Sequence, residues 1–231
     1  MKVLDLFAGL KGWSEPFAER GHEVLTLDYL PHFECDYAVD ILEWSPDDLP
    51  WKPDVVLASP PCEKFSTMGF QYGYFDTVWI KTGPGLRQGY WEAKPQRPEA
   101  VHAMKLVQAA IDIIEATKPS FYVIENPKAL LRTVNMIPYE RRTVWYCHYG
   151  EHRAKPTDLW GGFPPSLVLS PECHNRRESH TDPKCCCKDH TAAPRGSRTG
   201  TQGMNRELSA KIPYPLAEAI CLTAEADIDG A

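Results

Sequence analysis

Two residues in this sequence have side chains suited to covalent chemistry on a ring, and each follows an apolar segment. Cys62 ends the run 59–62 (Ser-Pro-Pro-Cys), where two prolines restrict the backbone and thereby the direction of the thiol. Glu125 follows the apolar segment 121–124 and precedes Asn126. A thiolate is a strong nucleophile even when only partly ionised. A cysteine and a glutamate on one rim could therefore attack an electron-poor ring and hold its protonated nitrogen.

Other polar residues occur in the order expected of a nucleoside site. The segment 7–12 (Phe-Ala-Gly-Leu-Lys-Gly) follows the first apolar run, and its glycines permit a tight turn that a ligand can approach. Asp28 could accept hydrogen bonds from ribose hydroxyls, and Asp40 could accept one from an adenine amino group. The dinucleotide fingerprint G-x-G-x-x-G is absent. This pattern favours S-adenosylmethionine, which needs no pyrophosphate cradle.

Alternating strands and helices would bring these residues to one edge. Apolar runs predict strands at 2–7, 23–28, 37–41, 54–58, 121–124 and 143–148, and helices at 13–20, 97–117 and 215–222. The inner face of the long helix is marked by Val101, Met104, Val107, Ile111 and Ile114. The alternation predicts an α/β fold with a doubly wound parallel sheet, in which ligands bind at the carboxyl ends of the strands.

Three motifs in this order resemble those of the cytosine-5 DNA methyltransferases. They are 5–9 (Asp-Leu-Phe-Ala-Gly), 59–62 followed by Phe65-Ser66, and 125–126 (Glu-Asn). The match covers about residues 1–150 and the C-terminal helix. The later stretches 146–150, 155–157 and 194–200 are similar to short methylases of bacteriophage genomes. The sequence departs from the family at Pro127, where a valine is usual, and near 209–214, where the usual Gly-Asn-Ser/Ala-Val is not recognisable.

The resemblance implies a Rossmann-like, S-adenosylmethionine-dependent DNA (cytosine-5-)-methyltransferase. The target cytosine would be flipped out of the duplex, because its C5 and C6 atoms cannot be reached inside the stack. Cys62 would attack C6, and C5 would then take the methyl group. The implied catalytic residues are Cys62, Glu125, Asn126 and Arg142. The implied cofactor-binding residues are Phe7, Ala8, Gly9, Asp28, Asp40 and Pro60.

We expect three parts in the chain. Residues 1–150 would form the cofactor-binding and catalytic domain, with a mostly irregular catalytic loop at 59–96 that closes over the flipped base. Residues 151–206 would form a small target-recognition region that reads two to four base pairs, and 207–231 a C-terminal helix. Residues 173–206 hold seven Lys and Arg against three Asp and Glu, which suits phosphate contact. The expected DNA-binding residues are Ser66, Arg176, Arg177, Arg195 and Arg198.

A cluster of cysteines and histidines lies in the same region. Its ligand types suit a structural zinc, although its spacing matches no standard finger. The proposed zinc ligands are Cys173, Cys185, Cys187 and His190. The alternative is a set of free or redox-active thiols.

Composition excludes several other classes of protein. The chain has 231 residues and a net charge of −6, with 43% hydrophobic residues, which argues against wholesale disorder and against non-specific coating of nucleic acid. No apolar run is long enough for a membrane span, and Asp5 interrupts what could be a signal peptide. The resemblance implies double-stranded DNA as the partner, and we expect a monomer in the cytoplasm, or in the host cytoplasm if a phage encodes it. Two alternatives stay open: a transfer-RNA cytosine-5 methyltransferase of the same fold, and a non-catalytic nucleic-acid-binding relative.

Overall fold

The computed structural model describes residues 1–65, 78–85, 90–151, 155–170 and 206–229. Its main feature is a seven-stranded sheet with the strand order β3-β2-β1-β4-β7-β9-β8. The strands of this sheet are β1 (Lys2–Leu6), β2 (Glu23–Asp28), β3 (Tyr37–Ala38), β4 (Val55–Ala58), β7 (Phe121–Pro127), β8 (Glu140–Trp145) and β9 (Pro156–Gly161). The helices are α1 (Glu15–Glu19), α2 (Pro98–Thr117), α3 (Leu131–Val134), α4 (Arg206–Ala210) and α5 (Tyr214–Asp229).

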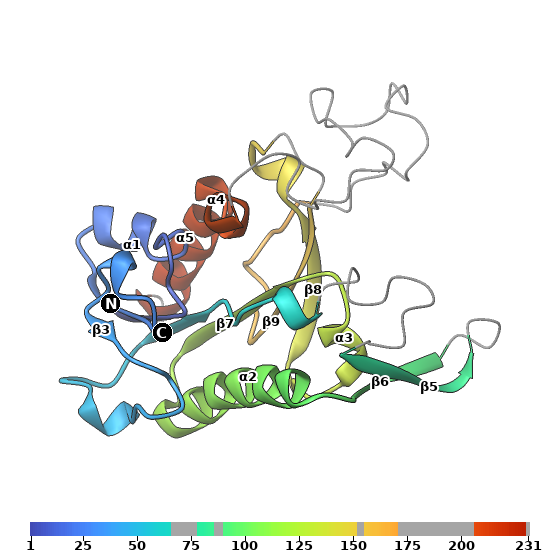
Figure 1. The fold of residues 1–231 in the computed structure, drawn as a ribbon. Coiled ribbons are helices and arrows are strands. Elements are labelled where there is room, and N and C mark those ends of the chain that lie inside the picture. Colours follow the sequence, from blue (N-terminus) through green and yellow to red (C-terminus); the bar gives the residue numbers. More distant parts are fainter. Residues whose placement is uncertain (66–77, 86–89, 152–154, 171–205, 230–231) are drawn as a thin grey trace.

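The predicted doubly wound α/β sheet is confirmed. Strands β3, β2, β1, β4 and β7 pair in parallel, and the chain runs outward from β1 on one side and from β4 on the other. Figure 1 shows the resulting layers, with α1, α4 and α5 on one face of the sheet and α2 and α3 on the other. The order reverses between β1 and β4, and their carboxyl ends therefore form the switch point at which such sheets bind ligands.

One strand of the sheet was not predicted. β9 lies between β7 and β8 and pairs antiparallel with both, so the sheet is mixed rather than wholly parallel. Its residues 156–161 come from the segment assigned to target recognition, and the sheet thus extends beyond residue 150 along the chain. β8 also begins three residues earlier than predicted and ends at Trp145, where a 3-10 turn (Tyr146–Tyr149) follows.

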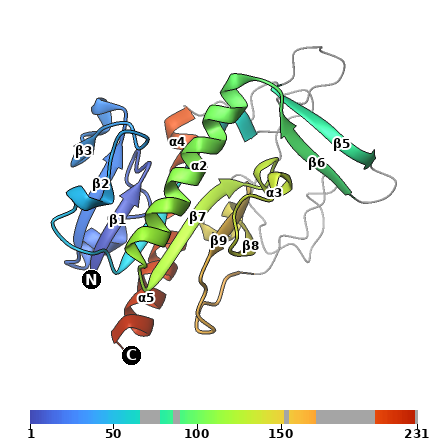
Figure 2. The ribbon, with the colours of Figure 1, turned by 90° about the horizontal axis from the view of Figure 1, so that it is seen from below.

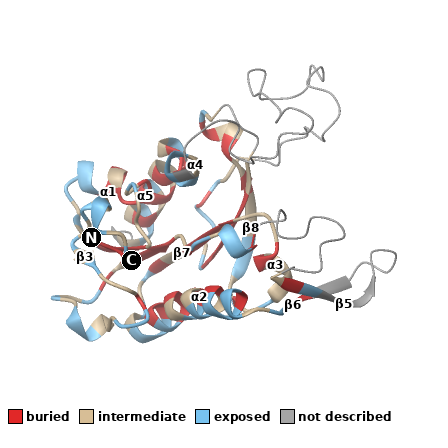
Figure 3. Ribbon diagram, in the orientation of Figure 1, coloured by how far each residue is buried: buried red, intermediate tan, exposed pale blue. Residues whose placement is uncertain are grey.

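Side chains from the central strands are buried on both faces of the sheet. Along β1, Val3 packs toward α1 and α5, whereas Leu4 packs toward α2. β4 repeats this alternation with Val55 and Val56. Figure 3 shows buried positions along β7 and on the side of α2 that faces the sheet. Burial on both faces explains why these strands read as continuous apolar runs in the sequence.

Helix α2 follows its predicted boundaries closely. Pro98 occupies the first turn, and the helix ends where Lys118 adopts a left-handed conformation (φ 48°), with its N–H donating to the carbonyl of Ile114. Of the five residues expected on its inner face, Val107, Ile111 and Ile114 are buried, and Met104 is partly buried. Val101 is 43% exposed, whereas its neighbour Ala100 is fully buried, so the inner face of the first turn is marked by Ala100 and not by Val101.

The segment 64–96, expected to be mostly irregular, contains a two-stranded hairpin. β5 (Trp79–Gly85) pairs antiparallel with β6 (Tyr90–Pro95), and the hairpin projects beyond the end of α2 (Figure 2). At its base Trp79 is 1% exposed and packs against Phe65, with 5.5 Å between ring centroids. The hairpin is therefore anchored next to the turn that follows Cys62.

The C-terminal helix α5 packs on the face of the sheet that carries α1, and it is longer than the predicted 215–222. In α5, Leu216, Ala217 and Ile220 are fully buried against the core that holds Phe17 of α1. The turn before α5 also packs closely against Gly12. A Cβ at Gly12 would lie 2.8 Å from the backbone nitrogen of Ile212, so only glycine fits there without a shift. No helix in the described ranges has both the length and the apolar character needed to cross a bilayer.

Candidate active site

The loop that carries Cys62 leaves the carboxyl end of β4 and is fixed at both ends. Before the cysteine, the indole N–H of Trp13 donates to the hydroxyl of Ser59 at 2.9 Å. After it, the backbone N–H of Leu130 donates to the carbonyl of Phe65 at 2.9 Å, and the Phe65 ring is fully buried. Cys62 itself is half-buried between these anchors. The thiol thus sits on a constrained loop at the edge where ligands are expected.

The carboxyl end of β7 lies beside this loop. Glu125 and Asn126 are both buried, and the Asn126 amide Nδ2 donates to the carbonyl of Pro60 at 2.9 Å. This bond links the segment that carries the glutamate to the segment that carries the cysteine. The other amide atom of Asn126, Oδ1, is buried and has no hydrogen-bond partner among the described residues.

The charges around Glu125 and Cys62 influence each other. Burial raises the pKa of the Glu125 carboxyl, while the Lys155 ammonium and hydrogen bonds from Tyr146 and Ser59 oppose that rise. Burial also raises the pKa of the Cys62 thiol; the negative charge of Glu125 raises it further and Lys155 lowers it. The thiol and the carboxyl group are therefore close enough for the ionisation of one to affect the other.

A tightly turned loop follows β1 at the neighbouring position of the edge. Phe7 and Gly9 both have left-handed backbones, with φ of 58° and 49°. The Gly9 N–H donates to Oδ2 of Asp28 at 3.0 Å, and the Leu30 N–H donates to Oδ1 of the same carboxylate at 2.9 Å. Asp28 is therefore held between the loops after β1 and β2, and Ala8, between Phe7 and Gly9, bonds to the Leu27 carbonyl through its N–H.

Asp40 lies further along the same side of the sheet. It is half-buried and accepts the Leu42 N–H at 3.0 Å. β3 ends at Ala38, so Asp40 stands in the loop after the strand rather than in the predicted strand 37–41. Asp28 and Asp40 thus follow two neighbouring strands, as a nucleoside site requires.

Asp5 is a buried carboxyl group near this loop. It is 1% exposed, and the Ser14 hydroxyl donates to Oδ2 at 2.6 Å. Its Oδ1 is buried without a partner in the described residues. Burial, opposed by the bond from Ser14, raises the pKa of Asp5 to about 7. The end of β1 beside the switch point therefore offers one acceptor that has no partner among the described residues.

Arg142 lies apart from Glu125. Its guanidinium donates to Glu140 at 2.9 Å and to the Leu167 carbonyl at 3.1 Å, and it stacks over the Phe163 ring at 4.8 Å. In the sheet register Arg142 is opposite Leu159 of β9, the residue that is opposite Glu125 on the other side. A whole strand therefore separates Arg142 from Glu125, and its contact with a cytosine stays a prediction.

The groups that contact Glu125 were not assigned a role from the sequence. Tyr146 donates from its hydroxyl to Oε1 at 3.0 Å, and the Lys155 ammonium lies 4.0 Å from the same oxygen. Both residues fall in the stretches that resemble bacteriophage methylases. The pairing of β9 with both β8 and β7 brings Tyr146 and Lys155 to Glu125, and this pairing cannot be read from the sequence.

The remaining predicted residues lie outside the described ranges. These are Ser66, Arg176, Arg177, Arg195 and Arg198, and the zinc set Cys173, Cys185, Cys187 and His190. Among described residues, one His/Cys/Glu group has potential ligand atoms within 4.8 Å of one another: His22, Cys221 and Glu225. Arg20 donates two hydrogen bonds to Glu225, and His22 contacts the N-terminal amine. This group is an ion-pair cluster separate from the predicted zinc ligands.

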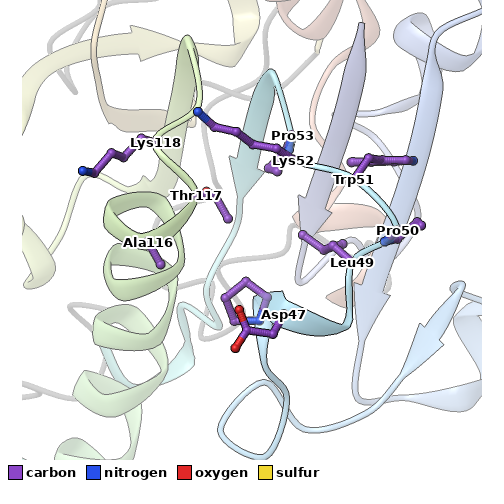
Figure 4. A pocket seen from close by; sticks show the side chains of 10 residues that line it. Asp47, Leu49, Pro50, Trp51, Lys52, Pro53, Ala116, Thr117 and Lys118 are labelled. Carbon is purple, nitrogen blue, oxygen red and sulfur yellow. The ribbon is translucent and has the colours of Figure 1, made fainter.

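A large hollow in the described surface lies far from this edge. It measures about 520 Å³ and is lined by residues 46–47, 49–53 and 116–118 (Figure 4). Lys52 and Pro53 precede β4, and Lys118 precedes β7, so the hollow is at the amino ends of these strands. A second hollow, of about 470 Å³, lies against α1 and β2. Neither includes Cys62 or Glu125, and the chemistry of the site, rather than hollow size, locates the candidate active site.

The fold defines an α/β protein of the Rossmann-like class, and the candidate residues Cys62 and Glu125 lie at the carboxyl ends of its strands. The chain resembles the cytosine-5 DNA methyltransferase family. It is 28% identical over 221 residues to a frog virus 3 protein named "Probable DNA (cytosine-5)-methyltransferase", and the match covers 92% of this chain and 95% of that protein. No protein-family model matches the chain.

One solved structure is similar to part of this chain. It is the crystal structure of a "putative DNA modification methyltransferase encoded within prophage" from E. coli, with a TM-score of 0.47 and 16% sequence identity over 74% of this chain. The aligned part spans about half of that protein, 49% of its chain.

Proposed function

We propose that this protein is an S-adenosylmethionine-dependent DNA (cytosine-5-)-methyltransferase. The observation that carries the proposal is the hydrogen bond from Asn126 to the Pro60 carbonyl, which joins the Cys62 loop to the Glu125 segment at one edge of the sheet. The similarity to the frog virus protein over nearly the whole chain supports the same activity. The two other functions left open by the sequence are tested by the experiment below.

The loops after β1 and β2 fit the proposed cofactor. Phe7 and Gly9, on either side of Ala8, have left-handed backbones that turn the chain tightly at this edge, and Asp28 retains acceptor capacity beyond its two backbone bonds. The buried, unpaired Oδ1 of Asp5 is an acceptor that a bound ammonium or hydroxyl group would satisfy. When bound, S-adenosylmethionine supplies an electrophilic methyl group on a sulfonium ion. Asp40 would contact its adenine, and Pro60 would shape the wall between cofactor and base.

The chain's own residues would carry out the covalent steps. A flipped cytosine would enter the edge between the two loops, since C6 is inaccessible in the stacked duplex. The Cys62 thiolate would form a bond to C6, and Glu125 would hold the protonated N3 and the amino group as charge develops on the ring. C5 would then become nucleophilic and take the methyl group, while the carbon–sulfur bond of the sulfonium breaks and its sulfur leaves as a neutral thioether. Loss of the C5 proton and breakage of the sulfur–C6 bond would release 5-methylcytosine and the free thiol.

Burial of the Cys62 thiol raises its pKa and so affects its reactivity before the base is bound. A raised pKa keeps most of the Cys62 thiol protonated before a base is bound, which limits its reaction with other electrophiles. Through its hydrogen bond to the Pro60 carbonyl, Asn126 would hold the Cys62 loop at a fixed position relative to Glu125.

The nucleic-acid side of the proposal rests on the sequence. We propose duplex DNA as the substrate, read by residues 151–206 with contacts from Ser66, Arg176, Arg177, Arg195 and Arg198. A structural zinc in that region, a monomeric state and action in the cytoplasm of the cell or host belong to the same proposal.

The test is methyl transfer by the purified protein. Wild type should convert cytosine to 5-methylcytosine in duplex DNA with labelled S-adenosylmethionine, as measured by nucleoside analysis. Cys62→Ala should abolish this, whereas Cys147→Ala, at another half-buried cysteine, should keep most of it. Activity on transfer RNA alone would favour the RNA enzyme. Full activity of Cys62→Ala would refute the mechanism, and an inactive wild type that still binds DNA would favour the non-catalytic relative.

A further inference from the structure

Tyr146 and Lys155 are neighbours across the end of the β8–β9 pair. The last paired residues are Trp145 and Pro156, and the ladder continues with the Tyr146 N–H donating to the Lys155 carbonyl at 3.1 Å. Tyr146 is fully buried, and the Lys155 side chain is 18% exposed. Two positions just beyond the paired strands, joined by a backbone hydrogen bond, thus bring a phenol and an ammonium together.

Both groups reach one oxygen of Glu125. The Tyr146 hydroxyl donates to Oε1 at 3.0 Å, and the Lys155 Nζ lies 4.0 Å from that atom. Burial and the neighbouring Glu125 charge raise the pKa of Tyr146 well above its ordinary value, so the hydroxyl remains a donor. The pair therefore holds one edge of the carboxylate in a defined orientation.

Lys155 is itself held in place by two further contacts. Its Nζ donates to the Ser209 carbonyl of α4 at 3.2 Å and lies 4.5 Å from the centroid of the Tyr146 ring. The fixed position reduces the conformational entropy lost when the ammonium interacts with Glu125. A freely moving surface lysine would not have this set of partners.

The other charged and polar groups around Glu125 come from two elements, the loop after β4 and the strand β9. Ser59, on the loop after β4, hydrogen-bonds to the carboxyl group, and Asp158 of β9 opposes its ionisation. The Cys62 thiol faces it from the same loop as Ser59. Among the described residues, Lys155 is the cation whose charge lowers the pKa of both Glu125 and Cys62. Its charge is therefore the main electrostatic counterweight to burial of the carboxylate.

We propose that Tyr146 and Lys155 are positioning residues for the active-site glutamate, the phenol orienting its carboxylate and the ammonium stabilising its charge and that of the Cys62 thiolate. The inference rests on the proposed function, because it assigns the pair to Glu125 of that site. Lys155, just before β9, is thereby the cation next to Glu125. Arg142 of β8 cannot take this place, because strand β9 lies between it and the glutamate.

The sign of the expected change follows from the charges. Removal of the Lys155 ammonium removes a group that lowers the pKa of both Glu125 and Cys62, so both pKa values rise. A charge at about 4–6 Å shifts the pKa of a carboxyl group by about 1–3 units, and the pKa of the Cys62 thiol shifts in the same direction. Lys155→Met therefore moves both ionisations toward higher pH.

The first test is alkylation of Cys62, which does not require catalysis. The rate of iodoacetamide labelling at Cys62, followed by peptide mass spectrometry from pH 6 to pH 11, reports the thiolate fraction. Lys155→Met should shift this curve upward by about one pH unit, and Lys155→Arg should leave it near the wild-type position. Lys211→Met, which removes an ion pair with Glu15, is the matched control and should not shift it. An unchanged curve in a folded Lys155→Met variant overturns the inference.

The second test is the pH profile of methyl transfer under single-turnover conditions on plasmid DNA. Lys155→Met should lose about tenfold at neutral pH and regain part of it at higher pH, whereas Tyr146→Phe should lower the rate without the same displacement. A uniform loss at every pH in Lys155→Met would indicate a structural role and overturn the inference. If wild type transfers no methyl group while the labelling shift is present, the proposed function fails and the electrostatic pairing stands.

Discussion

Asn126→Ala should separate the stability of the fold from the function of the site. The Asn126 side chain is fully buried, and its Nδ2 makes the 2.9 Å bond to the Pro60 carbonyl. Leaving that carbonyl without its donor should cost about 1–3 kcal/mol. The substitution also removes the Oδ1 acceptor, which has no partner and whose burial already carries a similar penalty.

These two effects oppose each other, so the net loss in free energy of unfolding should be small. We expect about 1 kcal/mol, which corresponds to a fall in Tm of about 2–4 °C for a chain of this size. Activity should fall far more, by at least about a hundredfold, because a loop displaced by about 1 Å no longer presents the thiol correctly to C6.

The assay pairs thermal and urea unfolding with single-turnover methylation of plasmid DNA. Gln108→Ala is the control, since the Gln108 side chain is exposed on α2 and, within the described ranges, donates to Asp112 one turn away. It should change neither measurement appreciably. Near-normal methylation by Asn126→Ala would show that the bond to Pro60 does not position the site. A fall in Tm above 10 °C would show that the residue is mainly structural.

Three further changes test the elements that support the site. Arg132→Met should destabilise the fold by about 3–5 kcal/mol in urea unfolding, because it leaves the fully buried Asp158 carboxylate without its cation; an effect below 1 kcal/mol would contradict this. Gly12→Ala should cost about 1–3 kcal/mol, since the new methyl group meets the backbone of Ile212; an unchanged Tm would show that this contact yields easily. Asp5 has a folded pKa of about 7 against 3.8, so the native state binds the extra proton between these values and wild type loses stability as the pH rises from about 4 to 7. Asp5→Asn should flatten that dependence in thermal scans, and an unaltered slope would argue against the assignment.

The central sheet could be predicted from the sequence because its strands carry their own signal. Each central strand has apolar side chains on both faces of the sheet, as with Val3 and Leu4 in β1 and Val55 and Val56 in β4. This pattern can be read from each strand alone. The order of the motifs then places Cys62 and the glutamate at the same edge without any knowledge of long-range contacts.

The edge of the sheet beyond β7 could not be predicted in this way. β9 includes Asp158, which reads as a loop residue and is buried only because Arg132 and Thr143 hydrogen-bond to it. β8 begins with three charged residues, 140–142, as an outer strand of the sheet often does. Its predicted start therefore fell at the first β-branched residue, Thr143.

The same limitation explains what was missed in the site. Lys155 reaches Glu125 through a strand pairing that no local pattern encodes. Gly12 shows the opposite case. Its sequence context suggests a ligand-binding turn, but the structure requires glycine there because residues 211–212 pack too closely for a side chain.

Covalent capture of the enzyme on modified DNA tests the central claim most directly. Duplex DNA in which 5-fluorocytosine replaces cytosine blocks the last step, because fluorine at C5 cannot leave as a proton does. With S-adenosylmethionine present, wild type should form a stable protein–DNA adduct that peptide mass spectrometry maps to Cys62, and Cys62→Ala should form none. An adduct at another residue, or methylated DNA without any adduct, would contradict the proposed nucleophile.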